Sequence, residues 1–213
     1  MIARHSFGGG FETQVLVGLL AIATTSSTFL AYYNIKRLQI DQHRAWMLRT
    51  WFYAGSIITL RIIMIISTLV ITQAGGFYQG RPCKEIAFTL DDDKTFANSY
   101  PQCFVANGST DGWVAVKADF AGNVAQIGTS LGVTFGTAGW LALVMHAVGV
   151  EIYLKLTPRE SNRLRDVSYQ RQLEAGFSHA GSSGLTVERW GDADEWKPSE
   201  STGIKVEASP ESN

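Results

Sequence analysis

The stretch from His43 to Thr72, HRAWMLRTWFYAGSIITLRIIMIISTLVIT, decides the fold class of this chain. It begins as a basic, aromatic cap and continues as an apolar run from Trp51 to Ile71. A helix needs about 20 mostly apolar residues to cross a bilayer, and this run supplies them. Arg61 lies well inside the run. An arginine at that depth is costly without a partner or water, so it marks a functional or structural site in a membrane protein.

Two further apolar segments flank this stretch. Residues 11–35 end in an interfacial Tyr32-Tyr33 pair, and residues 122–156 are rich in glycine. A cleaved signal peptide is an alternative for residues 11–35, but the apolar character resumes at Phe29, which favours a span. We therefore expect an all-α integral membrane protein in contact with the lipid bilayer, with spans over about 11–35, 46–74 and 122–156.

The composition excludes several functional classes. A net charge of −1 gives no field that would attract nucleic acid. Two cysteines without a C-x-x-C pair argue against a zinc site, so we predict no metal. No Walker-type loop, H-E-x-x-H, G-x-S-x-G or dinucleotide motif is present. Most soluble enzyme classes therefore lack their usual signature here.

Basic residues near the ends of the spans predict the orientation. The linker 34–49 carries Lys36, Arg37, Arg44 and Arg49, and a second basic cluster follows residue 156. Positive residues near span ends favour the cytoplasmic side. The polar segment 75–121 and the N-terminus are then extracytoplasmic, in an endomembrane or the plasma membrane.

Two features of segment 75–121 agree with that orientation. Cys83 and Cys103 are candidates for a disulfide, which an oxidising compartment permits. Asn107 begins an Asn-Gly-Ser glycosylation sequon, so the chain is a candidate glycoprotein.

For the C-terminal part, residues 157–213, the sequence predicts a cytoplasmic helix followed by a mostly disordered tail. Thr157 and Pro158 predict a helix start, Leu164, Val167 and Leu173 form a sparse apolar stripe, and Gly176 predicts the helix end. From Ser178 onward the composition indicates disorder, with a short ordered piece at 185–190.

Four intramembrane polar residues are candidate site residues: Arg49, Arg61, His146 and Glu151. Arg61 follows Arg49 by 12 residues, roughly 18 Å along a helix. His146 lies at a similar depth in the third span and Glu151 nearer its cytoplasmic end. If the two spans are neighbours, Arg49–Glu151 and either Arg61–His146 or Arg61–Glu151 are expected contacts. Arg61 could instead bind an anionic group, a haem propionate or a proton-relay partner, but an ion pair between spans is preferred.

The histidines admit a second interpretation. His43 and His146 are candidate ligands of a haem b iron. For His146 the simpler interpretation is a hydrogen-bonded packing residue, and for His43 an interfacial basic cluster with Arg44 and Trp46. No cofactor is therefore predicted, and haem b is the alternative.

Gly128, Gly132 and Gly136 recur every four residues and leave one face of the third span bare. Such faces let a neighbouring backbone approach closely. We expect internal helix packing there; the alternative is contact with a second copy or another membrane protein.

The cap HRAWMLR, with His43, Arg44, Trp46 and Met47, and the later Leu60-Arg61 pair resemble the membrane protein family called domain of unknown function 2306. The Phe-Gly-Gly-Gly run at residues 7–10 fits the same family, and residues 157–160 and 185–196 resemble its filamentous-fungal members. Members of that family usually carry at least one further span upstream, so the resemblance implies a short or truncated form.

The family has no assigned activity, so the resemblance implies none. The sequence favours a polytopic membrane protein without catalysis of its own, acting as a packing, scaffold or small-molecule-binding module. Haem-dependent redox function is the alternative, and an enzyme that uses Glu151 as an acid is a weaker one.

Overall fold

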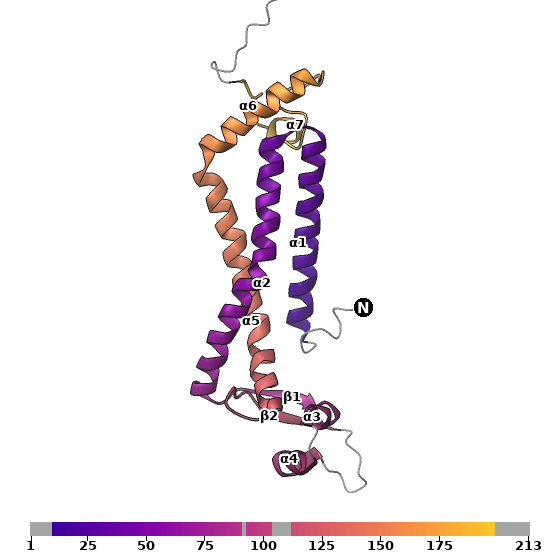
Figure 1. Cartoon of the computed structure of the whole chain (residues 1–213), viewed down its shortest axis with the longest axis vertical. Coiled ribbons are helices and arrows are strands. Elements are labelled where there is room, and N and C mark those ends of the chain that lie inside the picture. The colour runs from indigo at the N-terminus through magenta and orange to yellow at the C-terminus, as the bar shows by residue number, and fades with distance from the viewer. Residues whose placement is uncertain (1–9, 91–92, 104–111, 199–213) are drawn as a thin grey trace, which may run out of the picture. The chain divides into compact units, whose positions relative to one another are not determined.

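The computed structural model describes residues 10–90, 93–103 and 112–198. It is mostly helical, and three helices are long and apolar enough to cross a membrane: α1 (Phe11–Lys36), α2 (Ile40–Ala74) and α5 (Val124–Leu156) (Figure 1). The fold class predicted from hydropathy is confirmed. The chain divides into two compact units, which we call unit 1 (residues 1–21 and 54–146) and unit 2 (residues 22–53 and 147–213).

The predicted linker at residues 34–49 is almost entirely helical. Helix α1 runs to Lys36 and α2 begins at Ile40, so only residues 37–39 form the turn. Leu38 has a φ of 53° in this turn, a left-handed conformation that is rare for a side chain with a Cβ atom. The residues from Ile40 to Arg49 contain neither Gly nor Pro and include strong helix formers. The basic charge that marked this segment as a linker is compatible with a helix that extends beyond the apolar run.

Between α2 and α5, unit 1 contains a small ordered subdomain. Its elements are β1 (Tyr78–Pro82), α3 (Cys83–Leu90), α4 (Asp93–Ser99), the 3-10 helix η2 (Pro101–Cys103) and β2 (Trp113–Lys117). The two strands are antiparallel, with Tyr78 opposite Lys117 and Pro82 opposite Trp113. From the sequence, this segment was predicted only as a polar loop. The strands are short and separated by helices, so no hairpin turn signal announces them.

A disulfide holds this subdomain together. Cys83 and Cys103 are bonded, with their Cα atoms 5.5 Å apart, and both side chains are buried. Ile86, Phe96 and Val116 pack around them in the same core. The predicted disulfide is therefore present, whereas the sequon at Asn107 lies outside the described residues.

The glycine face of α5 packs within unit 1. A Cβ atom at Gly132 would lie 3.2 Å from the side chains of Arg81 and Gln79 on β1. At Gly136 it would meet Glu12 of α1 at 2.7 Å. Gly128 has open space around its Cα, but its carbonyl accepts a hydrogen bond of 2.9 Å from Arg81. Gly136 thus lies against α1 and Gly132 against side chains of β1, and close helix packing along the whole glycine face stays a prediction.

Unit 2 contains α6 (Pro158–Glu174) and the short α7 (Val187–Trp190). Thr157 occupies the predicted N-cap position, but its hydroxyl donates to the carbonyl of Tyr153 instead of capping α6. Gly176 ends the helix with a φ of 72°, and Phe177 N donates to Gln172 O at 3.0 Å. This is the Schellman arrangement expected of a glycine at that position.

The predicted apolar stripe of α6 is only partly buried, with Leu164 and Val167 half-buried. Leu173 is 50% exposed, whereas the buried side chains of α6 are the polar Ser168 and Gln172. The ordered chain continues through α7 to Pro198, further than the short piece at 185–190 that the composition suggested. Polar contacts, described next, hold this segment in place.

Candidate functional site

The turn between α1 and α2 is the centre of a buried network of hydrogen bonds in unit 2, which we call the polar frame. Gln39 is fully buried; its amide nitrogen donates to Asp41 at 2.8 Å and to the carbonyl of Gly181 at 3.1 Å. Its amide oxygen accepts from the backbone N–H of Gly184 at 3.1 Å. One side chain in the turn thus holds two points of the C-terminal segment.

Gln172 connects α6 to the same network. Its side-chain amide donates to Arg37 O at 2.8 Å and to Gln39 Oε1 at 3.0 Å, and its oxygen accepts from Gly181 N at 2.6 Å. Because buried polar groups are costly unless paired, these bonds specify one position for the C-terminal segment.

Two more side chains complete the polar frame. Asn34 at the end of α1 accepts from Leu185 N at 2.8 Å. Ser168 of α6 accepts from Ile40 N at 2.8 Å and donates to Asp41 at 3.1 Å. The first turn of α2 is therefore tied to α6 through one hydroxyl group.

The HRAWMLR cap joins the other helices of unit 2. His43 Nδ1 lies 2.9 Å from the carbonyl of Ala31 on α1. Arg44 donates to Thr157 at 3.3 Å and to Ser161 at 3.4 Å, at the junction of α5 and α6. The cap residues thus contact three different helices. These contacts explain why polar and basic residue types occur at these positions. Met47 of the cap is half-buried.

Arg49 and Glu151 form the predicted ion pair. Arg49 Nε donates to one carboxylate oxygen at 2.6 Å and its terminal nitrogen to the other at 3.0 Å. The guanidinium also lies 4.6 Å from the ring of Trp46. A planar guanidinium that engages both oxygens gives geometric specificity as well as attraction. Both oxygens of Glu151 are occupied, an arrangement that suits an architectural pair better than an acid catalyst.

His146 lies against α2 in unit 1. Its Nε2 is 2.8 Å from Thr59 Oγ1, and its Nδ1 faces Gly55, where an added Cβ would lie 3.7 Å away. The absence of a side chain at Gly55 makes room for the imidazole. This environment matches the packing interpretation of His146, because neither ring nitrogen is directed away from α2.

The position of Arg61 differs from the predicted contact with the third span. Its side chain is exposed on α2 and makes no hydrogen bond or ion pair with the described residues. The expected Arg61–His146 contact is wrong, because His146 bonds Thr59 instead. The burial pattern of α2 explains the difference, since Leu60 is buried and its neighbours Arg61 and Ile62 are exposed.

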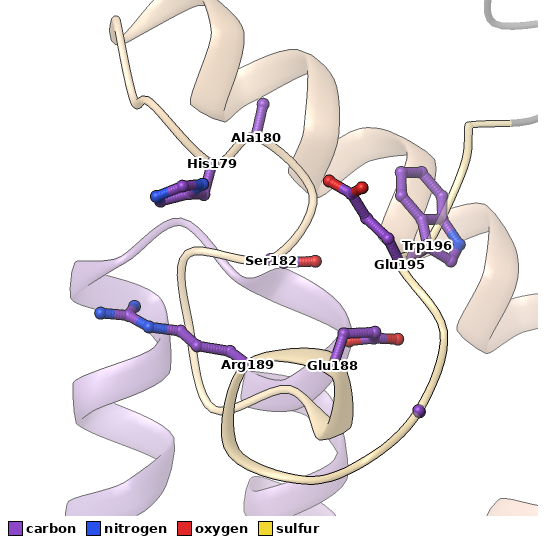
Figure 2. Close-up of a pocket in the computed structure, with 8 residues that line it drawn as sticks. His179, Ala180, Ser182, Glu188, Arg189, Glu195 and Trp196 are labelled. Atoms are coloured by element: carbon purple, nitrogen blue, oxygen red, sulfur yellow. The ribbon is translucent and has the colours of Figure 1, made fainter.

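The C-terminal segment that the polar frame holds forms a half-open cavity of about 490 Å³. Its lining comes from the loop after α6, from α7 and from the residues that follow: His179, Ala180, Ser182, Glu188, Arg189, Ala193, Glu195 and Trp196. Figure 2 shows Glu188, Glu195 and Trp196 on one side and His179 and Arg189 on the other, with Ser182 between them. A cavity of this volume is in the range of small-molecule sites.

An ion pair forms one wall of this cavity. Arg165 of α6 lies 2.8 Å from Glu188, and both side chains are largely buried. Burial raises the pKa of the Glu188 carboxyl, but the Arg165 guanidinium and neighbouring hydrogen bonds outweigh it, and the net pKa is lowered. Arg165 also lies 4.9 Å from the ring of Trp196. Trp196 is therefore fixed by a cation–π contact and shapes the cavity.

The chemistry of the cavity is mixed. Arg189 donates to the carbonyl of Ser183 at 2.6 Å, which fixes its guanidinium at the rim. Glu195 lies on the opposite side of the cavity, beside the indole ring of Trp196, so the lining carries charges of both signs. Such a lining suits a small molecule that carries both charges. Among the described residues, no group of three or more His, Cys, Asp or Glu side chains is placed to hold a metal ion.

Comparison with known proteins tests the family resemblance. Residues 2–79 match the family described as predicted membrane protein (DUF2306), and this range contains the HRAWMLR cap and Leu60-Arg61. The match bears out the resemblance predicted from the cap, and the protein is an integral membrane protein.

One fungal relative extends the similarity. The chain is 27% identical over 185 residues to the Ava biosynthesis cluster protein G of Aspergillus versicolor. The alignment covers 72% of this chain and 54% of the relative, so the chain spans about half the length of the curated relative it matches. No solved structure matches the chain.

The polar frame was not predicted from the sequence. None of its side chains was identified as a candidate: Asn34, Gln39, Asp41, Ser168 and Gln172. Uncharged polar residues carry no periodic signal, and their partners are distant in sequence: Gln39 and Gly184 are 145 residues apart. The buried polar residues of α6, Ser168 and Gln172, are four residues apart and share one face of the helix. From hydropathy alone, such a polar face is predicted to be exposed to solvent.

Proposed function

We propose that this membrane protein is a non-catalytic module that binds a small polar molecule in the cavity of its C-terminal segment. The observation that carries the proposal is the cavity of about 490 Å³, with carboxylate, guanidinium and indole groups in its lining. A zwitterion such as an amino acid would complement Glu195 and Arg189 and place its side chain against Trp196.

The contacts of the intramembrane candidates support a non-catalytic function. Glu151 is held by Arg49 through both carboxylate oxygens. His146 packs on α2 beside Thr59. These side chains are positioned by one another, as expected of residues that hold helices in register.

The basic residues at the span ends support an orientation with the cavity in the cytoplasm. Lys36, Arg37, Arg44 and Arg49 lie around the turn between α1 and α2, and further arginines follow α5. The disulfide Cys83–Cys103 in the segment between α2 and α5 is compatible with an oxidising compartment. In intact vesicles, a protease added on the cytoplasmic side of the membrane should remove the C-terminal segment. A protease added on the opposite side should leave it intact.

Thermal unfolding in detergent tests the binding. Each amino acid is added at millimolar concentration, and the Tm of the parent is compared with that of Ala193→Trp, which fills the cavity. A ligand at 100 times its Kd adds about 2.7 kcal/mol of stability, so at least one amino acid should raise the parent Tm by several degrees. Asp192→Asn, an exposed neighbour that does not line the cavity, should behave like the parent. Binding is refuted if no amino acid raises the Tm, or if Ala193→Trp responds equally.

Haem b is the alternative to a protein without a cofactor, and one contact is relevant to it. His43 Nδ1 lies 2.9 Å from a backbone carbonyl, an arrangement that often orients a ligating histidine. His146, packed between Gly55 and Thr59, does not fit the second ligand as placed. A Soret band in purified protein that disappears in His43→Ala would establish haem; a featureless spectrum of stable protein would exclude it.

A further inference from the structure

One face of α2 in unit 1, which we call the Arg61 face, is exposed and apolar except for its arginine. Its residues recur at helical spacing along the outer side of the helix: Ile57, Ile58, Arg61, Ile62, Ile65, Ile66, Leu69 and Val70. The buried Leu60 lies on another side of the helix, and Thr68, seven residues after Arg61 and therefore on nearly the same line, is buried and lies 3.0 Å from Thr134 of α5. Arg61 thus lies where the exposed apolar side of α2 borders the side that packs against α5, and it makes no hydrogen bond or ion pair with the described residues.

Arg61 lies at the middle of the apolar run. Ten residues separate it from Trp51 and ten from Ile71, about 15 Å in either direction. Because the hydrocarbon core is about 30 Å thick, its backbone lies near the midplane of the bilayer. Arginines near helix ends extend to the headgroups, but a central arginine is at the greatest distance from both interfaces.

We propose that the Arg61 face is a docking site for a transmembrane helix of another membrane protein that carries a carboxylate near its own centre. We choose a partner with a carboxylate because its charge complements that of Arg61. A guanidinium offers five N–H donors in a planar fork that matches a carboxylate, and a bilayer provides no water to satisfy them. The row of isoleucine side chains above and below Arg61 supplies the van der Waals surface that packs helices together in lipid.

A second copy of the chain is a poorer occupant of this face. A two-fold contact through the Arg61 face would place the same surfaces together, and two guanidinium groups would then meet in a medium of low dielectric constant. The acid near the cytoplasmic end of α5, Glu151, is already held by Arg49.

Energy transfer in vesicles tests this proposal with a defined probe. The full chain carries a donor dye, and a synthetic poly-leucine helix of about 23 residues with one central Glu carries the acceptor, in phosphatidylcholine vesicles. The Glu helix should bind the parent with an apparent Kd about 3- to 20-fold lower than it binds Arg61→Leu. An all-leucine helix should bind both proteins equally. Equal binding of the Glu helix to parent and variant would overturn the proposal.

Two further arms identify other occupants. Arg61→Lys keeps the charge but loses the planar fork, and it should bind the Glu helix with intermediate affinity. Arg61-dependent energy transfer between donor- and acceptor-labelled copies of the chain would overturn the proposal in favour of a dimer. Displacement of the Glu helix by phosphatidylglycerol would overturn it in favour of a lipid phosphate.

Discussion

Replacing Gln172 by methionine tests whether the polar frame holds the C-terminal segment. Methionine keeps the volume and the helix propensity of the side chain but removes three hydrogen bonds, to Arg37 O, Gln39 Oε1 and Gly181 N, of 2.8, 3.0 and 2.6 Å. Each such bond contributes about 0.5–1.5 kcal/mol net, and a buried group left without a partner costs more. We expect the docking of residues 177–186 to weaken by about 2–4 kcal/mol.

Limited proteolysis measures this change. Where cleavage is slow relative to reclosing, its rate follows the population of the open segment. A loss of about 2–4 kcal/mol then raises the cleavage rate within residues 177–186 by about 30- to 900-fold. The matched control is Asn162→Ala, an exposed position on the same helix, which should cleave like the parent. A rate for Gln172→Met within twofold of the parent would show that the polar frame does not hold the segment.

The remaining predictions concern packing, pH and the disulfide. Gly139→Ala places a Cβ against Leu16 and 2.9 Å from Leu60, so it should lower the Tm through about 1–3 kcal/mol of overpacking, whereas Gly128→Ala, with nothing within 4 Å, should not. The pKa of Glu188 is lowered in the folded state, so its contribution is present at neutral pH and is lost as the pH falls through the folded pKa; the Tm of Glu188→Gln should therefore fall less on acidification than that of the parent. Reduction of the disulfide, which closes a separation of 20 residues, should destabilise its subdomain by about 3 kcal/mol; unchanged hydrogen exchange there after reduction would contradict this.

Hydropathy was sufficient to locate the long helices because each apolar segment must satisfy its backbone within itself in a membrane. The helix end at Gly176 followed in the same way, since a glycine that accepts positive φ acts through its immediate neighbours. The pairing of Arg49 with Glu151 also followed from depth along two helices, once those helices were assumed to be neighbours.

The position of Arg61 could not be predicted in this way. Depth along the helix says how far a residue lies from each interface, but not in which direction its side chain points. The direction depends on which side of α2 packs against other helices. The buried Ser56 and Leu60 mark that side, roughly 100° or more around the helix from Arg61. An arginine expected to face inward is therefore exposed.

The sequence by itself determined what its local composition controls: three spans, a basic cap, a disulfide-capable segment and a helix end at Gly176. Only the tertiary structure decided that the C-terminal segment folds back onto the α1–α2 turn and forms a half-open cavity. The physical reason is the range of the interactions. A span depends on neighbours along the chain, whereas the buried amide of Gln39 depends on partners more than 100 residues away, which no local pattern identifies.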